Sequence, residues 1–451
     1  MNDNSKYELS RALKNRHIQM IAIGGAIGTG LFLGSGTAIS EAGPSIIVSY
    51  LLTGIICFFL MRSIGELLLS DVSKHSFIEF IGKYLGDKWE FISGWTYCLC
   101  WLLLAMTDLT ASGIYMKFWF PNLKQWITPL IIIIFLLLFN LVNVKFFGEL
   151  ESGFSLIKVL AILCLIVVGF YLILIHFHTN FSVVSLHNLV NHGGFFPTGM
   201  SGFLKSFQMV IFAFVGIEMV GLTAGETENP EVNLPKAVNS LPIRIGLFYI
   251  GSMIVIMSVY PWNKIVTDVS PFVQVFSTIG IKSAAAIINF VVLTAAISAC
   301  NSAIFTVSRT IRNLAQNNHC PQILAKLNKR KVPINSLYLT AAILMIVVLL
   351  NFVIPKDVFN LLSGVSSLSF IFVWLILMLT HLVYKRQNKH QLTNFKMPLY
   401  PYSDYLSLAF FIISLVVLSL DTKLRLALIL VIIWLIILYA IYSFKTKSDR
   451  S

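Results

Sequence analysis

Long apolar stretches, separated by short polar segments, follow one another along the whole chain. Each stretch holds roughly 20 mostly apolar residues, which is long enough for an α-helix to cross the hydrocarbon core of a bilayer. About a dozen such stretches predict an all-α integral membrane protein, because a spanning helix satisfies its own backbone groups. The expected spans are 18–40, 44–69, 91–119, 127–146, 154–177, 204–224, 243–262, 283–307, 335–354, 360–384, 405–420 and 424–444.

Composition supports this interpretation and narrows the class of protein. Of 451 residues, 57% are hydrophobic and 12% are charged, whereas soluble domains carry about a quarter charged residues. The connecting segments are too short for a soluble catalytic domain, and no HExxH or GxSxG motif lies at membrane depth. The six cysteines lack the paired spacing of a zinc site. We therefore expect a transporter rather than an enzyme, without metal or cofactor; an ion channel or an intramembrane enzyme are the alternatives.

The basic residues predict an orientation. The net charge is +13, but the Lys and Arg residues form short clusters between apolar spans, which argues against nucleic acid as a partner and is typical of positive-inside topology. Of 33 basic residues, 23 lie in the two tails and in the loops on their side, against 8 on the opposite side. The chain is thus expected to have both termini in the cytoplasm, and its polar N-terminal tail does not resemble a signal peptide.

Two glycine-rich stretches interrupt the first and sixth expected spans. They read GGAIGTG at 24–30 and FVGIEMVG at 214–221. Glycine destabilises a helix interior by about 1 kcal/mol, so either stretch can unwind and present free backbone N–H groups, which suit a carboxylate. Gly28, Thr29 and Gly30 would form this cradle; close helix packing is the alternative explanation. Their separation by five helices suits a five-plus-five inverted repeat.

Several ionisable side chains lie at membrane depth, where they are costly. Arg62 and Glu66 are four residues apart, so we expect a structural pair on one helix face. Asp108 lies on a small, polar face and either meets a substrate ammonium or is a structural carboxylate. Lys158 either exchanges a proton after desolvation or snorkels to the interface. Glu218 can bind substrate, relay a proton or cap the broken backbone.

A stripe of polar side chains follows one side of the eighth expected span. Residues three or four positions apart share a helix face. Such a stripe either holds neighbouring helices together or lines a hydrophilic path. It consists of Thr294, Ser298, Asn301, Ser302 and Ser308.

The segment RHIQMIAIGGAIGTGLFLGSG, at 16–36, resembles the amino-acid transporter branch of the amino acid–polyamine–organocation (APC) superfamily. The resemblance continues in order through MRSIGELLLS, VKFFGELE, FAFVGIEMVGLTAGET and SPFV, and covers nearly the whole chain. It implies about twelve transmembrane helices in a five-plus-five inverted repeat (the LeuT-like or APC fold), with broken helices 1 and 6. The implied organisation is a cytoplasmic tail (1–17), a ten-helix transport core (18–384), a loop with two accessory helices (385–444) and a second cytoplasmic tail (445–451).

The resemblance also implies an activity. It is that of a multi-pass permease of the bacterial plasma (inner) membrane, which imports a small amino acid together with a proton by alternating access. Branch members that carry D-alanine, D-serine and glycine are the most similar, followed by asparagine permeases. A non-transporting amino-acid sensor is the alternative from another class.

Residue roles follow from the matching motifs. Lys158 matches a fifth-helix lysine that acts as a proton switch in some members, which favours proton exchange over snorkelling. Asp108 occupies a third-helix position that is acidic in both groups of similar members. The expected substrate-binding residues are Gly28, Thr29, Gly30, Asp108, Phe214, Gly216, Ile217, Ser298 and Asn301, and the expected proton-coupling residues are Lys158 and Glu218.

Overall fold

The protein is all-helical in the part of the chain that the structure describes. The one β-type pairing there is an isolated bridge between His178 and Val183, so the all-α expectation is confirmed. The computed structural model describes residues 27–71, 74, 76–141, 144–218, 229–328, 330–388 and 394–448. The expected N-terminal tail, the start of the first span and the end of the sixth lie outside these residues.

The helices coincide with the expected apolar stretches, but α7 (Val144–Leu174) begins ten residues before the fifth stretch and α14 (Lys282–Gln316) ends nine residues after the eighth. Two short helices, α4 (Phe77–Leu85) and α13 (Pro271–Thr278), were not expected, because each is shorter than a span. The helical elements that make up the described spans are the π-helix η2 (Gly30–Gly34), α2 (Ser35–Ala42), α3 (Ile46–Ser70), α5 (Asp87–Met116), α6 (Ile127–Asn140), α7 (Val144–Leu174), α8 (Gly199–Phe214), α10 (Pro230–Asn239), α11 (Leu241–Arg244), the π-helix η6 (Ile245–Ile250), α12 (Gly251–Val259), α14 (Lys282–Gln316), α15 (Ile334–Val353), α16 (Val358–Gln387), α17 (Tyr402–Leu420) and α18 (Arg425–Ser448).

The outer surface of the bundle is apolar. Within the described residues, nine helical stretches are long and apolar enough to cross a membrane, and the shorter α6 and α8 are apolar as well. Large apolar side chains such as Ile131, Leu138 and Leu174 are exposed on it. A surface of this kind is unfavourable in water and favourable in lipid.

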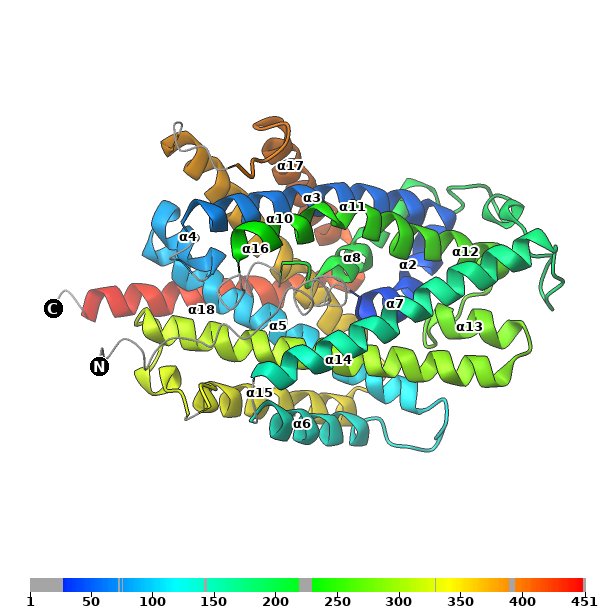
Figure 1. The fold of residues 1–451 in the computed structure, drawn as a ribbon, viewed down its shortest axis with the longest axis horizontal. Coiled ribbons are helices and arrows are strands. Elements are labelled where there is room, and N and C mark those ends of the chain that lie inside the picture. The colour runs from blue at the N-terminus through cyan, green and yellow to red at the C-terminus, as the bar shows by residue number, and fades with distance from the viewer. Residues whose placement is uncertain are drawn as a thin grey trace.

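Helices α5, α14 and α16 form the centre of the bundle. Helix α5 packs along both α14 and α16, and nearly all of its residues from Phe91 to Tyr115 are buried. Helix α7 crosses against α14 and α12, and the half-helix α8 packs against η2 and α2 (Figure 1). The first and sixth spans are therefore neighbours, at the heart of the molecule.

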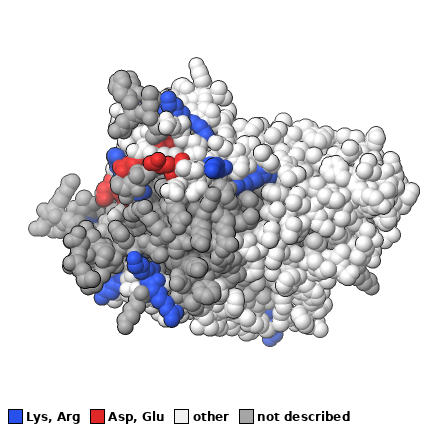
Figure 2. Space-filling model, viewed as in Figure 1, with Lys and Arg blue, Asp and Glu red and all other residues white. Residues whose placement is uncertain are grey.

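Charged side chains are unevenly distributed over the surface. On the face shown in Figure 2, most of the visible Lys, Arg, Asp and Glu residues gather toward the end at which α4 and the C-terminal part of α18 lie. The opposite end is almost entirely uncharged in this view. Charge at one end and an apolar flank are the distribution expected of a protein embedded in a bilayer.

Candidate functional site

The sixth span is broken where the glycine pattern predicted it. Helix α8 ends at Phe214, and Val215 leaves the helical region with φ −59° and ψ 137°. Gly216 follows with φ +99°, a backbone conformation that side-chain-bearing residues rarely adopt. The N–H of Ile217 still reaches the carbonyl of Phe214, at 3.4 Å. The glycine is therefore required for the turn itself.

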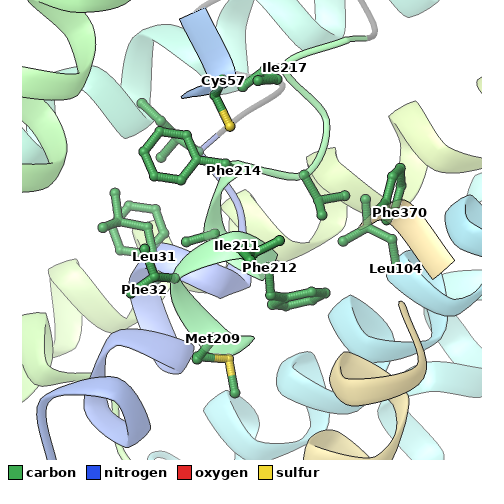
Figure 3. Packing of buried hydrophobic residues seen from close by; sticks show 14 of the residues in the cluster. Leu31, Phe32, Cys57, Leu104, Met209, Ile211, Phe212, Phe214, Ile217 and Phe370 are labelled. Carbon is green, nitrogen blue, oxygen red and sulfur yellow. The ribbon is translucent and has the colours of Figure 1, made fainter. Parts of the chain in front are cut away.

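Aromatic side chains hold this turn in place. The ring of Phe214 stacks on that of Tyr249, with centroids 4.8 Å apart and planes 9° from parallel. The Tyr249 hydroxyl donates a hydrogen bond of 3.0 Å to the carbonyl of Ala213, one of the carbonyls that lose their helical partner at a helix end. Figure 3 shows Phe214, Ile217 and Cys57 grouped around the turn. The break is thus supported by aromatic packing and by a side-chain hydrogen bond to the Ala213 carbonyl.

The described part of the first span starts at the GTG sequence. The carbonyl of Gly28 accepts hydrogen bonds of 3.2 Å from the N–H groups of Leu31 and Phe32. A π-helical turn, η2, then runs to Gly34, and π-turns inside helices are frequent at functional sites. The Ser270 hydroxyl donates a 2.6 Å bond to the Phe32 carbonyl, so the irregular backbone is supported from the α13 side.

Helix packing explains one glycine of the cradle but not the other. A Cβ on Gly30 would lie 2.7 Å from the Ala213 Cα and 3.0 Å from the Phe212 carbonyl oxygen. Both are backbone atoms and cannot move aside. A Cβ on Gly28 would meet only ordinary contacts, 3.6 Å from Ala299 Cβ and 4.0 Å from Asp108 Oδ1. Gly30 is therefore needed for the approach of the two broken spans, and Gly28 lies beside the carboxylate.

Asp108 joins α5 to the start of the first helical segment. It is fully buried, and its Oδ1 accepts a 2.6 Å hydrogen bond from the hydroxyl of Thr29. Its Oδ2 is buried and has no hydrogen-bond partner among the described residues. Leaving a charged acceptor unpaired in an interior is costly, so this oxygen suits a donor brought by a ligand.

Lys158 is buried in the bundle, so it does not snorkel. Its side chain is 0% exposed, and Nζ lies 3.8 Å from Oε1 of Glu151, which is also 0% exposed. The Ser298 hydroxyl lies 2.8 Å from each Glu151 carboxylate oxygen and donates to them. The charges of Lys158 and Asp108 also interact. We call Asp108, Glu151 and Lys158 the central cluster.

The sequence interpretation missed Glu151. A signal for it was present, because a residue seven positions before Lys158 lies two turns away on the same face of a helix. The structure shows that Lys158 is one half of a buried ion pair and not an isolated amine.

Glu218 lies just beyond the break in the sixth span. It is fully buried, and the Tyr97 hydroxyl lies 3.5 Å from its Oε1 as the donor. Its Oε2 has no hydrogen-bond partner within the described chain. A second buried carboxylate with a free oxygen thus lies at the break that Gly216 forms.

The polar stripe of α14 contacts neighbouring helices. Ser298 bonds to Glu151 on α7, as described above, and Asn301 Oδ1 accepts a 2.8 Å bond from Asn140 Nδ2 on α6. These contacts are those of a stripe that holds helices together. The Asn301 amide nitrogen remains without a partner among the described residues.

A second buried group of charges joins α3, α16 and α17. Glu66 Oε1 accepts a 2.7 Å bond from Lys385 Nζ, and Glu66 Oε2 accepts one from the Met397 N–H, also at 2.7 Å. His381 lies between two carboxylates, with Nε2 3.2 Å from Glu66 and Nδ1 2.8 Å from Asp404. We call Glu66, His381, Lys385 and Asp404 the Glu66 cluster.

Arg62 does not form the expected ion pair with Glu66. Its NH1 donates a 2.8 Å bond to Asn239 Oδ1, its NH2 donates to the Lys396 carbonyl, and its guanidinium carbon lies 3.7 Å from the centre of the Phe395 ring. The pairing was inferred from a four-residue spacing alone. The structure instead gives the two side chains separate partners, although both reach the segment that follows α16: Arg62 bonds to the Lys396 carbonyl and Glu66 to the Met397 N–H.

Three ligand-type side chains also meet away from the helix breaks. One atom each from Asp87, Glu90 and His319 lies within 4.8 Å of the others. Burial lowers the pKa of His319, and the charge of Lys445 acts in the same direction against that of Asp87. The Tyr442 hydroxyl donates to Asp87 at 2.8 Å, and Asn317 donates to Glu90 at 2.6 Å. Both carboxylates therefore have protein donors, which account for the group without a metal ion.

Comparisons with known proteins agree with this geometry. The chain is 55% identical to the uncharacterized transporter YdgF of Bacillus subtilis over 98% of its length and 97% of that protein's. It is 53% identical to the amino-acid permease AapA of Bacillus subtilis, over 100% of this chain and 98% of the relative. It is 47% identical to a D-serine/D-alanine/glycine transporter of Escherichia coli, over 96% and 93% of the two chains.

The family assignment covers almost the whole chain. The sequence model of the family described as "Amino acid permease" matches residues 17–451. This match includes both broken spans, the central cluster and the Glu66 cluster, and it agrees with the nine apolar helical stretches. The chain is a multi-pass membrane protein with the expected APC fold, and it belongs to the amino acid permease family.

Proposed function

We propose that the protein is a proton-coupled symporter that imports small neutral amino acids, chiefly D-alanine, D-serine and glycine, by alternating access. One observation carries the proposal: the start of the first helical segment lies against the broken sixth span at the centre of the bundle. Beside each lies a buried carboxylate with an oxygen that has no partner among the described residues, Asp108 from α5 and Glu218 from the sixth span. Discontinuous helices of this kind form the substrate sites of many secondary transporters.

The substrate is a zwitterion, and the site offers a complement for each of its charges. The N–H groups at Gly28, Thr29 and Gly30 lie at the start of the described helical segment, and the start of a helix favours an anion such as the substrate carboxylate. Asp108 Oδ2 suits the ammonium, since Thr29 already occupies the other oxygen. Phe214, Gly216 and Ile217 would line the opposite side, along the broken sixth span.

A small substrate is supported by the neighbours of the cradle and by the relatives. The side chain closest to a Cβ on Gly28 is that of Ala299, and Gly30 lies against Ala213. Both residues are small, and the backbone of Ala213 lies so close to Gly30 that little space remains there for a substrate side chain. The Escherichia coli relative named for D-serine, D-alanine and glycine is 47% identical over nearly its whole length.

Proton coupling is assigned to Lys158, with Glu218 as a second candidate at the other break. Lys158 is fully buried at an ion pair, so a change in its charge alters the electrostatics of Asp108 and of the packing between α7 and α14. We expect this change to favour one of the two alternating conformations. Ser298 and Asn301, both on α14, would transmit this change to neighbouring helices through their contacts with Glu151 on α7 and Asn140 on α6.

The orientation proposed is that of a bacterial inner-membrane permease with both termini in the cytoplasm. The excess of Lys and Arg in the loops on that side supports it, as does the charge gathered at one end of the bundle in Figure 2. In this scheme residues 18–384 form the transport core, and α17 and α18 are accessory helices. Helix α17 packs mainly on α16 and α3, and α18 packs on α16 and α5.

The test is uptake by the purified protein in proteoliposomes with an imposed proton gradient. Labelled D-alanine is supplied, and glycine, D-serine, L-alanine and L-asparagine compete. We expect accumulation above equilibrium that an uncoupler abolishes and that glycine and D-serine inhibit. Uptake of L-asparagine without D-alanine would reassign the substrate. Binding without any uptake would instead identify a sensor.

A further inference from the structure

We propose that Glu151 is the next proton carrier after Lys158, on the path by which the coupling proton leaves toward the cytoplasm. This inference rests on the proposed function, because it concerns the same proton. It assigns a role to a carboxylate that the sequence interpretation did not single out. It also changes the coupling site from a single lysine into a buried pair of proton-binding groups.

The geometry places the two groups within a short movement of each other. Lys158 Nζ and Glu151 Oε1 are 3.8 Å apart, and neither side chain is exposed. A hydrogen bond needs a separation of about 2.7–3.2 Å, so an approach of less than about 1 Å suffices. Ser298 donates to Glu151 from α14, and it therefore fixes the carboxylate in position facing the lysine.

The order along α7 gives the step its direction. Glu151 precedes Lys158 by two turns, which corresponds to about 10 Å along the helix axis. The N-terminal end of α7 is the cytoplasmic end in the proposed topology, since this helix follows the fourth span. Glu151 thus lies between Lys158 and the cytoplasm.

Charge balance favours one exchangeable proton in this cluster. With all groups ionised, Asp108, Glu151 and Lys158 carry two negative charges and one positive charge. The Lys158–Glu151 pair is neutral while it holds its one exchangeable proton, and it carries one negative charge after the proton has left. A buried net charge is strongly unfavourable, so the pair then takes up a new proton. The zwitterionic substrate leaves that balance unchanged, because its own two charges cancel.

The transfer itself needs no further reactant. An N–H bond of the Lys158 ammonium breaks, and an O–H bond forms on the Glu151 carboxylate, so a positive and a negative group become two neutral groups. The proton count of the pair is the same before and after. Glu151 then releases the proton to water on the cytoplasmic side, and its carboxylate is restored.

Few other ionisable groups face this pair from the elements packed against α7. Helix α14 brings Ser298 against Glu151, and its charged residues Lys282, Arg309 and Arg312 are at least three turns from Ser298 along the helix. The sequence of α12 contains no ionisable side chain, and η6 contributes the phenol of Tyr249, which is bonded to the Ala213 carbonyl. From the described part of α5, Asp108 acts on Lys158. The carboxylate of Glu151 is thus the acceptor placed to take the proton.

The experiment separates proton-driven accumulation from exchange. Glu151→Gln keeps the shape of the side chain and removes its proton-accepting charge. In proteoliposomes we expect it to lose accumulation against a gradient at least tenfold, while labelled substrate still exchanges with unlabelled substrate across the membrane. A pH-sensitive dye should also show that substrate addition no longer moves protons. Glu151→Asp, which retains a carboxylate, should restore part of both signals.

A surface pair provides the matched control. Lys74 and Glu79 are also 3.8 Å apart, but both side chains are partly exposed. Glu79→Gln should therefore leave accumulation, exchange and proton movement at the wild-type level. Thermal unfolding of each purified variant would show whether a loss of accumulation arises from misfolding. If Glu151→Gln is misfolded, Glu151→Asp is used to decide whether the carboxylate carries the proton.

Two results would overturn the inference. Proton-driven accumulation by Glu151→Gln at the wild-type level, together with its loss in both Lys158→Ala and Lys158→Arg, would leave the lysine as the carrier without Glu151. Equal loss of accumulation and exchange in well-folded Glu151→Gln and Glu151→Asp would show a structural role. If the wild type itself exchanges substrate but never couples it to protons, the proposed function fails before any variant is compared.

Discussion

The two buried groups of charged side chains are built differently. In the Glu66 cluster, both oxygens of Glu66 accept hydrogen bonds, from Lys385, from His381 and from the Met397 backbone. In the central cluster, Asp108 Oδ1 accepts a hydrogen bond from the Thr29 hydroxyl, and Oδ2 has no side-chain or ion partner among the described residues. Both carboxylates are buried, so burial alone does not distinguish them.

The difference separates a structural carboxylate from one that suits a ligand. A buried charge is stabilised when its hydrogen-bonding capacity is filled by the protein, and Glu66 meets that condition. Asp404 in the same cluster keeps one unpartnered oxygen, but it lies on the peripheral helix α17. Asp108 combines an unpartnered oxygen with a position beside Gly28 and the broken backbone. The combination, more than either feature alone, supports the proposal that Asp108 binds the substrate.

The largest expected effect is that of Gly30→Ala, and Gly65→Ala, next to Glu66, is the matched comparison. Gly30→Ala places a Cβ 2.7 Å from the Ala213 Cα, which cannot yield, so we expect uptake below about one hundredth of wild type. Gly65→Ala places a Cβ 2.5 Å from a ring atom of Phe395, a side chain that can tilt. Uptake by Gly65→Ala should stay within a few-fold of wild type. Equal losses of uptake in the two variants would show that the contact of Gly30 with Ala213 is no more important for transport than that of Gly65 with Phe395.

The next largest effect should come from Asp108→Asn. The amide has nearly the same shape but no charge to offer an ammonium, and a hydrogen bond to a charged group contributes about 1.5–3 kcal/mol. We therefore expect apparent affinity to fall by about 10–100-fold, as measured by binding of labelled D-alanine to the purified protein. Normal binding and transport by Asp108→Asn would show that Asp108 is a structural residue, as Glu66 is.

The sequence predicted the spans well because lipid imposes a simple rule. A helix must be long and apolar to cross a bilayer, and α3, α15 and α17 begin and end within three residues of the expected limits. The break at Gly216 was predictable for a related reason, since glycine weakens a helix where its backbone must turn.

Partners of buried charges were not predictable in the same way. Arg62 and Glu66 share a helix face, yet their partners Asn239 and Lys385 come from distant segments that only the fold brings close. Glu151 was detectable from its spacing to Lys158, but its bond to Ser298 depends on how α7 crosses α14. Local periodicity thus identifies faces of helices, and tertiary packing decides what those faces meet.

A smaller effect is expected from the hydrogen bond that orients Asp108. Thr29→Val removes the hydroxyl that donates at 2.6 Å and keeps the size of the side chain. A net contribution of about 0.5–1.5 kcal/mol for such a bond corresponds to about a 2–10-fold loss of substrate affinity. Thr29→Ser retains a hydroxyl and should bind within about twofold of wild type. If Thr29→Ser lost as much affinity as Thr29→Val, the methyl group and its packing would be responsible instead.

The smallest effect on transport, and the largest on stability, is expected from Glu66→Gln. Removing one charge of a buried, hydrogen-bonded group typically costs about 3–5 kcal/mol, because Lys385 and His381 lose their partner. Thermal unfolding of the purified protein should therefore occur at a clearly lower temperature, while uptake per folded molecule stays within about twofold. Asp71→Asn is the control: its 3.2 Å pair with Lys83 is partly exposed, and such pairs contribute about 0–1 kcal/mol. A strong loss of transport by folded Glu66→Gln would show that a carboxylate with all its hydrogen bonds filled by the protein can still take part in transport.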